Sequence, residues 1–351
     1  MQFESKEHEK FSKKDYNSFI LAGDIGGTNT KLAVFGIKGK KARLLLAFHF
    51  GSSELNSLEQ PVNYVLSYIG EKYKIKTEKA CFGVAGMISE KRNKCIITKL
   101  KWNVDKNRLL KNTKLKKIFL MNDFEAVGYG INLLEKKDIK TIKSARKVQK
   151  APIVVIGPGT GIGKATLVFN EEKKLYVPMP SEVGHSDFAA QDKFDMELID
   201  FIKKTKKIKE SISYDELVAG HGLSSIYLFL KKVKKFNDSK FSKEIENSDY
   251  SPEIISKYRN HDKTCSITFK IYKNYFARLA KNCALDAIPL GGLYFVGNIS
   301  NINKEIFDKE FVKAFESNYR VKELLKKTPI YLVLNTNIGL LGAGFFCAKG
   351  L

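Results

Sequence analysis

The sequence contains few cysteines and no long apolar run. Its five cysteines are scattered over 351 residues without a Cys-x-x-Cys pair, which argues against a structural zinc site or a disulfide framework. No apolar run approaches the roughly 18 residues of a membrane-spanning helix. Residues 1–17 are polar and mixed in charge, so we expect a loose extension rather than a signal peptide. We therefore expect a cytoplasmic protein with no membrane partner.

The chain has far fewer acidic than basic residues. The chain has 38 Asp and Glu against 61 Lys and Arg, a formal charge of +23, and such a surplus can indicate nucleic-acid binding. However, the runs KKTKKIK (203–209) and KKVKK (231–235) carry no interleaved aromatics. They are typical of solvated helix faces. We interpret the charge as surface lysine and expect no nucleic-acid partner, although salt-dependent retention on DNA would test that alternative.

Apolar patterns alternate between strand and helix periods, which predicts mixed α/β layers. Strands are expected at 19–23, 31–37, 43–50, 80–86, 117–123, 152–157, 164–169, 293–297 and 329–335. Helices are expected at 58–72, 124–134, near 194–204, 223–235 and 264–288, and after residue 338. Residues 133–150 are the expected crossing between two lobes.

Two glycine-rich turns stand at matching places in the two halves. The first is Asp24-Ile25-Gly26-Gly27-Thr28-Asn29 and the second spans GPGTGIG, residues 157–163. The second turn has Pro158 and Ala165 where a phosphate-binding P-loop needs Gly and Ser or Thr, and a strand rather than a Rossmann helix follows it. Both turns therefore predict strand–turn–strand units whose backbone N–H groups can hold phosphate.

Asp24 would repel a phosphate unless a cation lay between them. Mg²⁺ bound by one carboxylate, water and phosphate oxygens resolves this conflict. Ordinary hairpin chemistry is the alternative explanation for both turns. We favour phosphate binding, with Asp24 as the metal ligand.

An ordered set of motifs resembles the bacterial-type glucokinase family of the superfamily that unites sugar kinases with actin. The motifs are the first glycine turn, Asn122-Asp123-Phe124, the second glycine turn, Ser181-Glu182-Val183-Gly184-His185 and Gly339-Leu340-Leu341-Gly342-Ala343-Gly344. A sister group, the ROK family, typically adds a Cys-rich zinc motif after the His, and none follows His185. The resemblance spans residues 20–348.

The resemblance implies a two-lobed ribonuclease H-like (actin-like ATPase) fold with a cleft between the lobes. The smaller lobe would comprise residues 18–133 and 335–351, and the larger lobe residues 134–334. It implies an ATP-dependent hexose kinase that makes glucose 6-phosphate, a cytoplasmic enzyme with ATP and Mg²⁺ as cofactors and a homodimeric state. A kinase for another hexose or hexosamine, one with another phosphoryl donor, and a non-catalytic sugar-sensing regulator remain alternatives.

The resemblance also assigns site residues. Asp123 would be the base that accepts the hydroxyl proton, although capping of the following helix also explains an Asp at that position. The implied sugar contacts are Asn122, Glu182, His185, Asp215 and Glu216. The implied nucleotide contacts are Asp24, Gly26, Gly27, Thr28, Asn29, Gly157, Gly159, Thr160, Gly161, Gly292 and Gly297.

Four positions depart from the family pattern. Asp215 stands where the family has Glu, which leaves open whether Asp215 or the adjacent Glu216 reaches the sugar. Lys99 replaces an Asn, Asn298 replaces a Gly and Val183 replaces a small residue. None of these changes removes an implied catalytic group.

Overall fold

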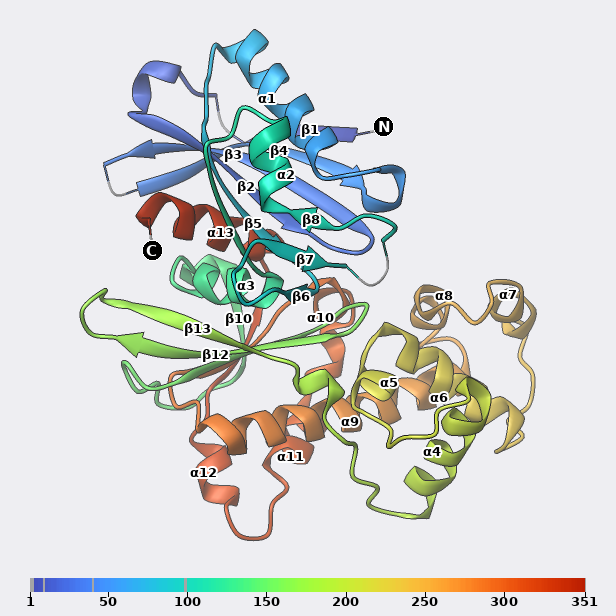
Figure 1. Cartoon of the computed structure of the whole chain (residues 1–351). Helices are drawn as coiled ribbons and strands as arrows, with labels where there is room; N and C mark the ends of the chain where they lie inside the picture. The colour runs from blue at the N-terminus through green and yellow to red at the C-terminus, as the bar shows by residue number, and fades with distance from the viewer. Residues whose placement is uncertain (1–2, 9, 40, 98–99, 351) are drawn as a thin grey trace. The chain divides into compact units, whose positions relative to one another are not determined.

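The computed structural model describes residues 3–8, 10–39, 41–97 and 100–350, and the chain divides into two compact units (Figure 1). The first unit comprises Met1–Glu135, Asn170–Pro180 and Asn337–Leu351. The second comprises Lys136–Phe169 and Ser181–Thr336. Residues 170–180, expected in the larger lobe, thus belong to the first unit. Lys99 lies outside the described residues.

The first unit is built on a mixed sheet with the strand order β1-β4-β3-β2-β5-β9. Its strands are β1 (Phe3–Glu7), β2 (Ser18–Ile25), β3 (Asn29–Lys38), β4 (Lys41–Gly51), β5 (Lys79–Val84) and β9 (Lys117–Asn122). Strands β2, β5 and β9 are parallel, with Ile25, Val84 and Asn122 in register. The first glycine turn and Asp123 therefore both follow the carboxyl-terminal ends of these parallel strands, at the same end of the sheet.

The two faces of this sheet bury alternate residues of each strand. Leu21 and Ile25 pack with helices α1 (Glu59–Tyr73) and α2 (Lys106–Asn112) on one face. Ile20 and Ala22 pack with helices α3 (Asp123–Ile131) and α13 (Ile338–Lys349) on the other (Figure 1). By the two-residue period of a strand, Asp24 belongs to the face that α3 and α13 cover.

The N-terminal segment is more ordered than the sequence predicts. Strand β1 pairs antiparallel with β4, from Phe3 opposite Phe50 to Glu7 opposite Leu46. The 3₁₀ helix η1 (Lys13–Asp15) follows, capped by Ser12. The expected loose extension is therefore replaced by an edge strand and a capped turn, because backbone pairing and capping supply hydrogen bonds that the polar composition did not indicate.

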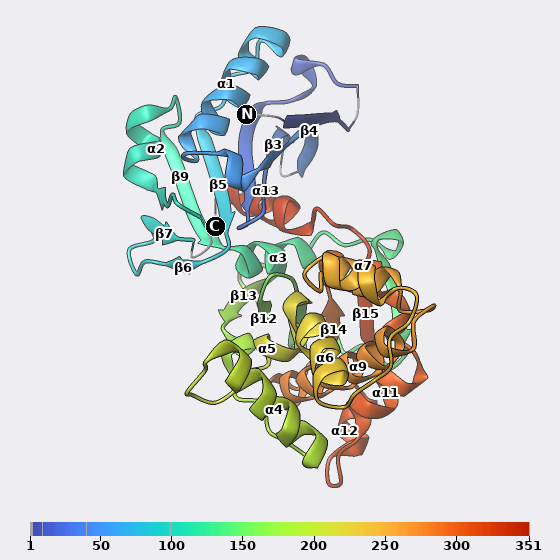
Figure 2. The same ribbon diagram turned by 90° about the vertical axis from the view of Figure 1, so that its right-hand side faces the viewer.

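The second unit contains a mixed sheet and a group of helices. Within the sheet the strands β10 (Ile139–Lys143), β15 (Ile330–Val333), β14 (Gly292–Phe295), β11 (Ile153–Pro158) and β12 (Ile162–Asn170) are neighbours in that order. Helix α6 (Gly220–Lys232) packs on the long α9 (Lys263–Ala287) and on α4 (Lys193–Lys206), as Figure 2 shows. Aromatic residues such as Tyr227, Tyr272 and Phe276 fill this core.

The expected helices and strands named above are confirmed, with ends shifted by a few residues. The structure adds short elements that had no clear pattern: η2 (Ser52–Glu54), β6 (Met87–Ile88), β7 (Lys94–Ile96), β8 (Val104–Asp105), η3 (Lys136–Asp138), β13 (Leu175–Ser181), η4 (Val183–His185), α5 (Asp215–Val218), α7 (Ser242–Asn247), α8 (Pro252–Lys257), α10 (Asn298–Ile302), η5 (Lys304–Ile306), α11 (Lys309–Glu316) and α12 (Lys322–Lys326). Over the described ranges, no helix combines the length and the apolar character that crossing a bilayer requires.

Candidate active site

The first glycine turn joins β2 to β3 and is held by Ser52. The Gly26 N–H donates to the Asn29 carbonyl at 2.8 Å, which closes the turn. Ser52 Oγ donates to the Gly26 carbonyl at 2.7 Å, and the Ser52 N–H donates to the Thr28 carbonyl at 2.9 Å. The Trp102 indole N–H donates to the Ser52 carbonyl at 3.2 Å. Ser52, the first residue after β4, therefore fixes the shape of the turn.

Gly27 and Thr28 lie in this turn, and Asn29 begins β3. Asn29 Oδ1 lies 3.0 Å from His49 Nε2, so its side chain is engaged with the neighbouring strand. The Thr28 side chain is exposed, and Gly27 is half-buried. Among the implied nucleotide contacts of this unit, backbone groups of the turn are thus better placed than the Asn29 side chain.

Asp24 lies at the end of β2, beside the first turn of α13. A Cβ on Gly339 would lie 3.4 Å from Asp24 Oδ2, so the carboxylate is in close reach of that helix end. Burial raises the pKa of the Asp24 carboxyl, and Lys31, which pairs with Asp24 from β3, opposes the shift. A divalent cation and the positive end of a helix both favour the ionised form.

The donor set around Asp24 fits Mg²⁺ carried by a polyphosphate. Among the described residues no group of three His, Cys, Asp or Glu side chains could hold a metal ion. Mg²⁺ is commonly held by one or two carboxylates, with water and phosphate completing its six ligands. Asp24 beside a turn with backbone N–H groups matches that mode.

Asn122, rather than Asp123, caps helix α3. Asn122 has an extended backbone, and its Oδ1 accepts from the N–H groups of Phe124 and Glu125 at 2.9 and 3.3 Å. Asp123 is the first helical residue, and its Oδ1 accepts from the Phe124 N–H at 2.9 Å. The conventional capping role is therefore filled by Asn122, which weakens the structural explanation for Asp123.

Gly83 allows α3 to lie directly on strand β5. A Cβ at this position would lie 2.8 Å from the Ala126 Cβ and 3.7 Å from the Asp123 Cα. Because neighbouring strands are about 4.8 Å apart, the in-register Ile25 and Asn122 are about 10 Å apart across β5. Asp123 and the first glycine turn are thus brought to the same end of one sheet.

Burial and the charge of Asp123 raise the pKa of the nearby Cys95 thiol to about 12, so this cysteine is a neutral thiol.

The second glycine turn is a β-hairpin, as the sequence predicts. Gly157 pairs with Gly163 and Pro158 with Ile162 across β11 and β12. The Gly159 N–H donates to the Gly161 carbonyl at 2.7 Å, and the Gly220 N–H donates to the Gly159 carbonyl at 3.0 Å. The start of helix α6 therefore contacts the turn, with Thr160 exposed at its tip.

Of the two later glycines, only Gly297 reaches this turn. Gly297 has φ of +92° and precedes α10, and a Cβ on it would lie 3.5 Å from the Pro158 carbonyl oxygen. Gly292 starts β14 opposite Ile153, at the other end of that strand. Gly292 has φ of +125°, and a Cβ on it would lie 2.7 Å from Tyr294 Cε2, so backbone conformation and packing explain this glycine. Asn298 is the first helical residue of α10, where a side chain causes no backbone strain.

Asp215 links the second glycine turn to the segment that carries Glu182 and His185. Asp215 Oδ1 accepts from the Ile162 N–H at 2.7 Å. A Cβ on Gly184 would lie 3.1 Å from the same oxygen. His185 Nε2 and Glu182 Oε2 are 4.0 Å apart, and both side chains are exposed. Three implied sugar contacts of the second unit are thus close to one another.

Glu216 faces a different set of groups. Its carboxylate pairs with Lys206, and its Oε2 lies 3.5 Å from His221 Nε2. The contact with His221, together with Lys206, lowers the pKa of Glu216 to about 2. Of the two adjacent carboxylates, Asp215 is therefore the one beside the Glu182–His185 segment.

Comparison with known proteins gives a consistent result over nearly the whole chain. The sequence profile described as Glucokinase matches residues 21–350. The chain belongs to the glucokinase family. A glucokinase from Nostoc punctiforme is 31% identical over 346 residues, which cover 95% of this chain and 99% of the relative.

Two solved glucokinases share the fold. The glucokinase from an Antarctic psychrotroph is 25% identical with a TM-score of 0.76, over 95% of this chain and 99% of that one. The glucokinase from Balamuthia mandrillaris in complex with glucose is 20% identical with a TM-score of 0.78, over 95% and 94%. The expected family and α/β fold class are confirmed, as is the expected enzyme class, an ATP-dependent hexose phosphotransferase.

Glucokinase family motifs did not point to two residues that the structure brings to the site. Ser52 contacts the first turn from 26 positions away in the chain. Arg92 pairs with Glu125 in the first turn of α3. Neither residue belongs to a recognisable motif, so only the fold identifies them.

Proposed function

We propose that this protein transfers the γ-phosphoryl group of ATP to the 6-hydroxyl of glucose. Asp123 accepts the hydroxyl proton while the hydroxyl oxygen bonds to the γ-phosphorus and ADP departs. The observation that carries the proposal is the position of Asp123: it starts α3 at the end of β9, at the same sheet edge as the first glycine turn, and Asn122 caps the helix in its stead. In phosphoryl transfer the base mainly orients the hydroxyl and accepts its proton late.

We assign phosphate binding to the two glycine turns and Mg²⁺ binding to Asp24. The backbone N–H groups of Gly27 and Thr28 and of Thr160 and Gly161 would hold phosphate oxygens, because the Gly26 and Gly159 N–H groups already close their own turns. Mg²⁺, when bound, neutralises charge on the phosphates. Gly297 supports the second turn by its close approach to Pro158, and Gly292 is left out of the site for the reason given above.

We assign sugar binding to Asn122, Glu182, His185 and Asp215. Carboxylate and imidazole groups can both pair with sugar hydroxyls. Glu216 is assigned instead to orienting this region through Lys206 and His221. The relative from Balamuthia mandrillaris was crystallised with glucose, which supports glucose as the first substrate to test.

Two further expectations accompany this proposal. The five cysteines are free and buried, which fits a reducing, cytoplasmic location. We also propose a homodimer, and light scattering coupled to size-exclusion chromatography would measure the mass of the particle.

A coupled assay with ATP and Mg²⁺ across a panel of hexoses and hexosamines tests the proposal. We expect turnover with glucose, and Asp123→Asn should lower kcat by about 10²–10⁴-fold with glucose affinity retained. Glucose binding by the wild-type chain without turnover on any sugar would instead establish the sensor alternative. Near-normal kcat in Asp123→Asn would remove Asp123 from the reaction.

A further inference from the structure

Two segments of the second unit carry its proposed sugar contacts. The first sugar segment, residues 181–189, contains Glu182 and His185, and the second sugar segment, residues 211–215, ends at Asp215. A sugar held by both segments requires a fixed distance between them, and such precision comes from buried neighbours that lock each segment in place. The residues that fix this distance therefore act on sugar binding without contacting the sugar.

Backbone hydrogen bonds join the two sugar segments to each other. The Tyr214 N–H donates to the Ser186 carbonyl at 3.1 Å, and the Phe188 N–H donates to the Ile212 carbonyl at 2.8 Å. These two hydrogen bonds flank an isolated antiparallel bridge. The Phe188 ring also meets the Tyr214 ring edge-on, with the ring centroids 5.3 Å apart. A shift of Phe188 would therefore change the position of both segments.

One face of helix α9 contacts both sugar segments. Tyr275, Arg278 and Asn282 are spaced three and four residues apart, so their side chains project from the same face of the helix. The Asn282 side-chain amide donates to the Tyr214 hydroxyl at 2.8 Å. The Tyr275 ring meets the Phe188 ring edge-on, with the centroids 4.9 Å apart. Helix α9 is thus the element on which the two segments rest.

Arg278 binds the first sugar segment with its guanidinium group. Its Nη2 donates to the Ala189 carbonyl, and its guanidinium carbon lies 4.3 Å from the centroid of the Phe188 ring. Its Nη1 donates to Asp195 Oδ2 at 2.8 Å, and the Arg278 side chain is only 6% exposed. A planar guanidinium can donate in two directions and stack on a ring at the same time, whereas a lysine ammonium has no planar face.

Asp195, in the first turn of α4, holds the guanidinium in this position. Asp195 Oδ1 accepts from the Tyr275 hydroxyl at 2.7 Å, and Oδ2 also accepts from the Gln191 N–H at 2.9 Å. Burial and the hydrogen bond to Asp195 raise the pKa of Tyr275, so its hydroxyl stays protonated and donates. Moving the guanidinium away would leave a buried carboxylate without its cation, which confines Arg278 to this geometry.

We propose that Arg278 is a positioning residue for sugar binding. By holding Phe188 and the Ala189 carbonyl, it fixes the first sugar segment against helix α9, and the backbone bridge passes this position on to Asp215. The inference rests on the proposed function, because it requires that the two sugar segments bind the hexose. Arg278 acts on the sugar segments and not on the phosphoryl donor, so its effect is confined to sugar affinity.

Arg278→Lys separates positioning from charge pairing. The lysine keeps a cation opposite Asp195 and loses the planar contact with Phe188 and the two-directional hydrogen bonding. We expect the glucose dissociation constant, measured by calorimetry, to rise about tenfold, with kcat and the KM for ATP within about twofold of wild type. Phe188→Leu, which leaves the Arg278–Asp195 pair in place, should weaken glucose binding in the same direction. Calorimetry needs no turnover, so it measures the effect independently of the reaction.

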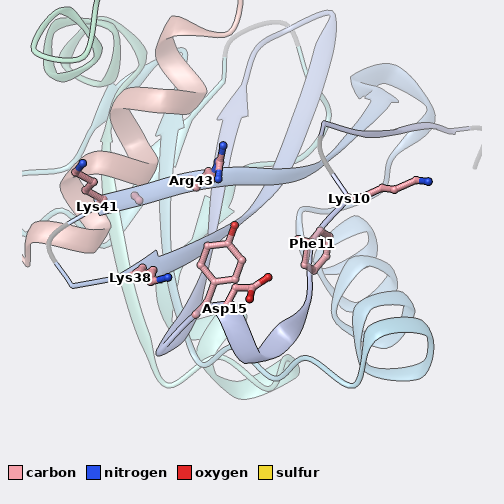
Figure 3. A pocket seen from close by; sticks show the side chains of 8 residues that line it. Lys10, Phe11, Asp15, Lys38, Lys41 and Arg43 are labelled. Atoms are coloured by element: carbon pink, nitrogen blue, oxygen red, sulfur yellow. The ribbon is translucent and has the colours of Figure 1, made fainter.

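Lys273→Met is the matched structural control. Lys273 lies on the same helix, its side chain is 12% exposed, and its Nζ pairs with Asp308 at 2.8 Å and with Glu310. Loss of this pair should lower stability and leave glucose affinity unchanged. Lys38→Gln, at the cavity of the first unit that Figure 3 shows, removes one exposed cation and controls for the change in net charge.

His185→Ala and Asp215→Asn test the underlying sugar assignment separately. If both weaken glucose binding while Arg278→Lys binds glucose as tightly as Lys273→Met, the positioning role is overturned and the sugar assignment stands. An equal rise of the glucose dissociation constant and the KM for ATP in Arg278→Lys would also overturn it, because a general structural defect affects both ligands. Wild-type glucose affinity in both His185→Ala and Asp215→Asn would overturn the sugar assignment and this inference with it.

Discussion

Arg92 Nη1 donates to both carboxylate oxygens of Glu125, at 3.0 and 2.9 Å. Arg92 lies in the turn between β6 and β7 and has a left-handed backbone, with φ of +48°. The Glu125 side chain is only 8% exposed and lies two residues after Asp123. The pair therefore fastens the short β6–β7 hairpin to the helical turn that carries the proposed base.

Arg92→Met should impair both stability and turnover. Glu125 would keep a buried carboxylate without its cationic partner, which costs about 1–3 kcal/mol of unfolding free energy. We expect kcat to fall more than the KM for glucose changes, because the first turn of α3 loses its anchor. Urea unfolding and steady-state kinetics measure the two effects.

Lys91→Met is the matched control, since Lys91 is the exposed neighbour of Arg92. Adding Glu125→Gln to Arg92→Met should recover part of the stability by removing the unpaired charge. Identical kinetics and stability in the Arg92 and Lys91 variants would contradict an anchoring role for the ion pair.

Ser52→Ala should weaken nucleotide binding. Ser52 Oγ donates to the Gly26 carbonyl and lies 2.8 Å from Thr30 Oγ1. Its loss therefore removes one hydrogen-bond partner from the buried Thr30 hydroxyl and one from the turn. We expect a several-fold higher KM for ATP, a smaller change in the KM for glucose, and about 1–2 kcal/mol lower unfolding free energy. Ser53→Ala, at an exposed position, is the control. A KM for ATP that stays at the wild-type value would show that the turn does not need this support.

The sequence predicted those parts of the fold that depend on local chemistry. FILAG and KLAVFGI around a glycine turn indicated the β2–β3 hairpin, because strand alternation and turn residues are visible within a few positions. Likewise GPGTGIG followed by an alternating segment predicted a hairpin instead of a P-loop, and β11 and β12 confirm it.

Other features of the site could be identified only from the folded structure. The sequence could not decide whether Asn122 or Asp123 caps α3, since both residue types are good caps and only the extended backbone of Asn122 decides. Gly292 and Gly297 are close in sequence, but a straight strand separates them in space. Ser52 reaches the first turn only because β4 pairs with β3.

Gly83→Ala should displace the start of helix α3, which carries Asp123. Its new Cβ would lie 2.8 Å from the Ala126 Cβ, so α3 must move away from β5. We expect a loss of about 1–3 kcal/mol of unfolding free energy from overpacking, together with lower kcat. Gly70→Ala in α1 is the control, because the nearest atom to its Cβ is the Ile75 carbonyl oxygen at 3.9 Å. That variant should gain about 0.5–1 kcal/mol through helix propensity. Normal kcat in Gly83→Ala would show that Asp123 tolerates the shift.

Glu216 should contribute a pH-dependent share of stability. Its pKa falls from an ordinary 4.5 to about 2 in the folded chain, through the contact with His221 and the ion pair with Lys206. A lowered folded-state pKa stabilises the fold above the unfolded pKa, and this contribution is lost as pH falls from about 4.5 towards about 2. Glu216→Gln should therefore lower the unfolding free energy at about pH 6 and have little effect near pH 2. Denaturant unfolding of both proteins across this range measures the difference, with the exposed Glu210→Gln as the control. A difference between wild type and Glu216→Gln that stays constant down to the lowest pH would rule out the ion-pair cluster as its source.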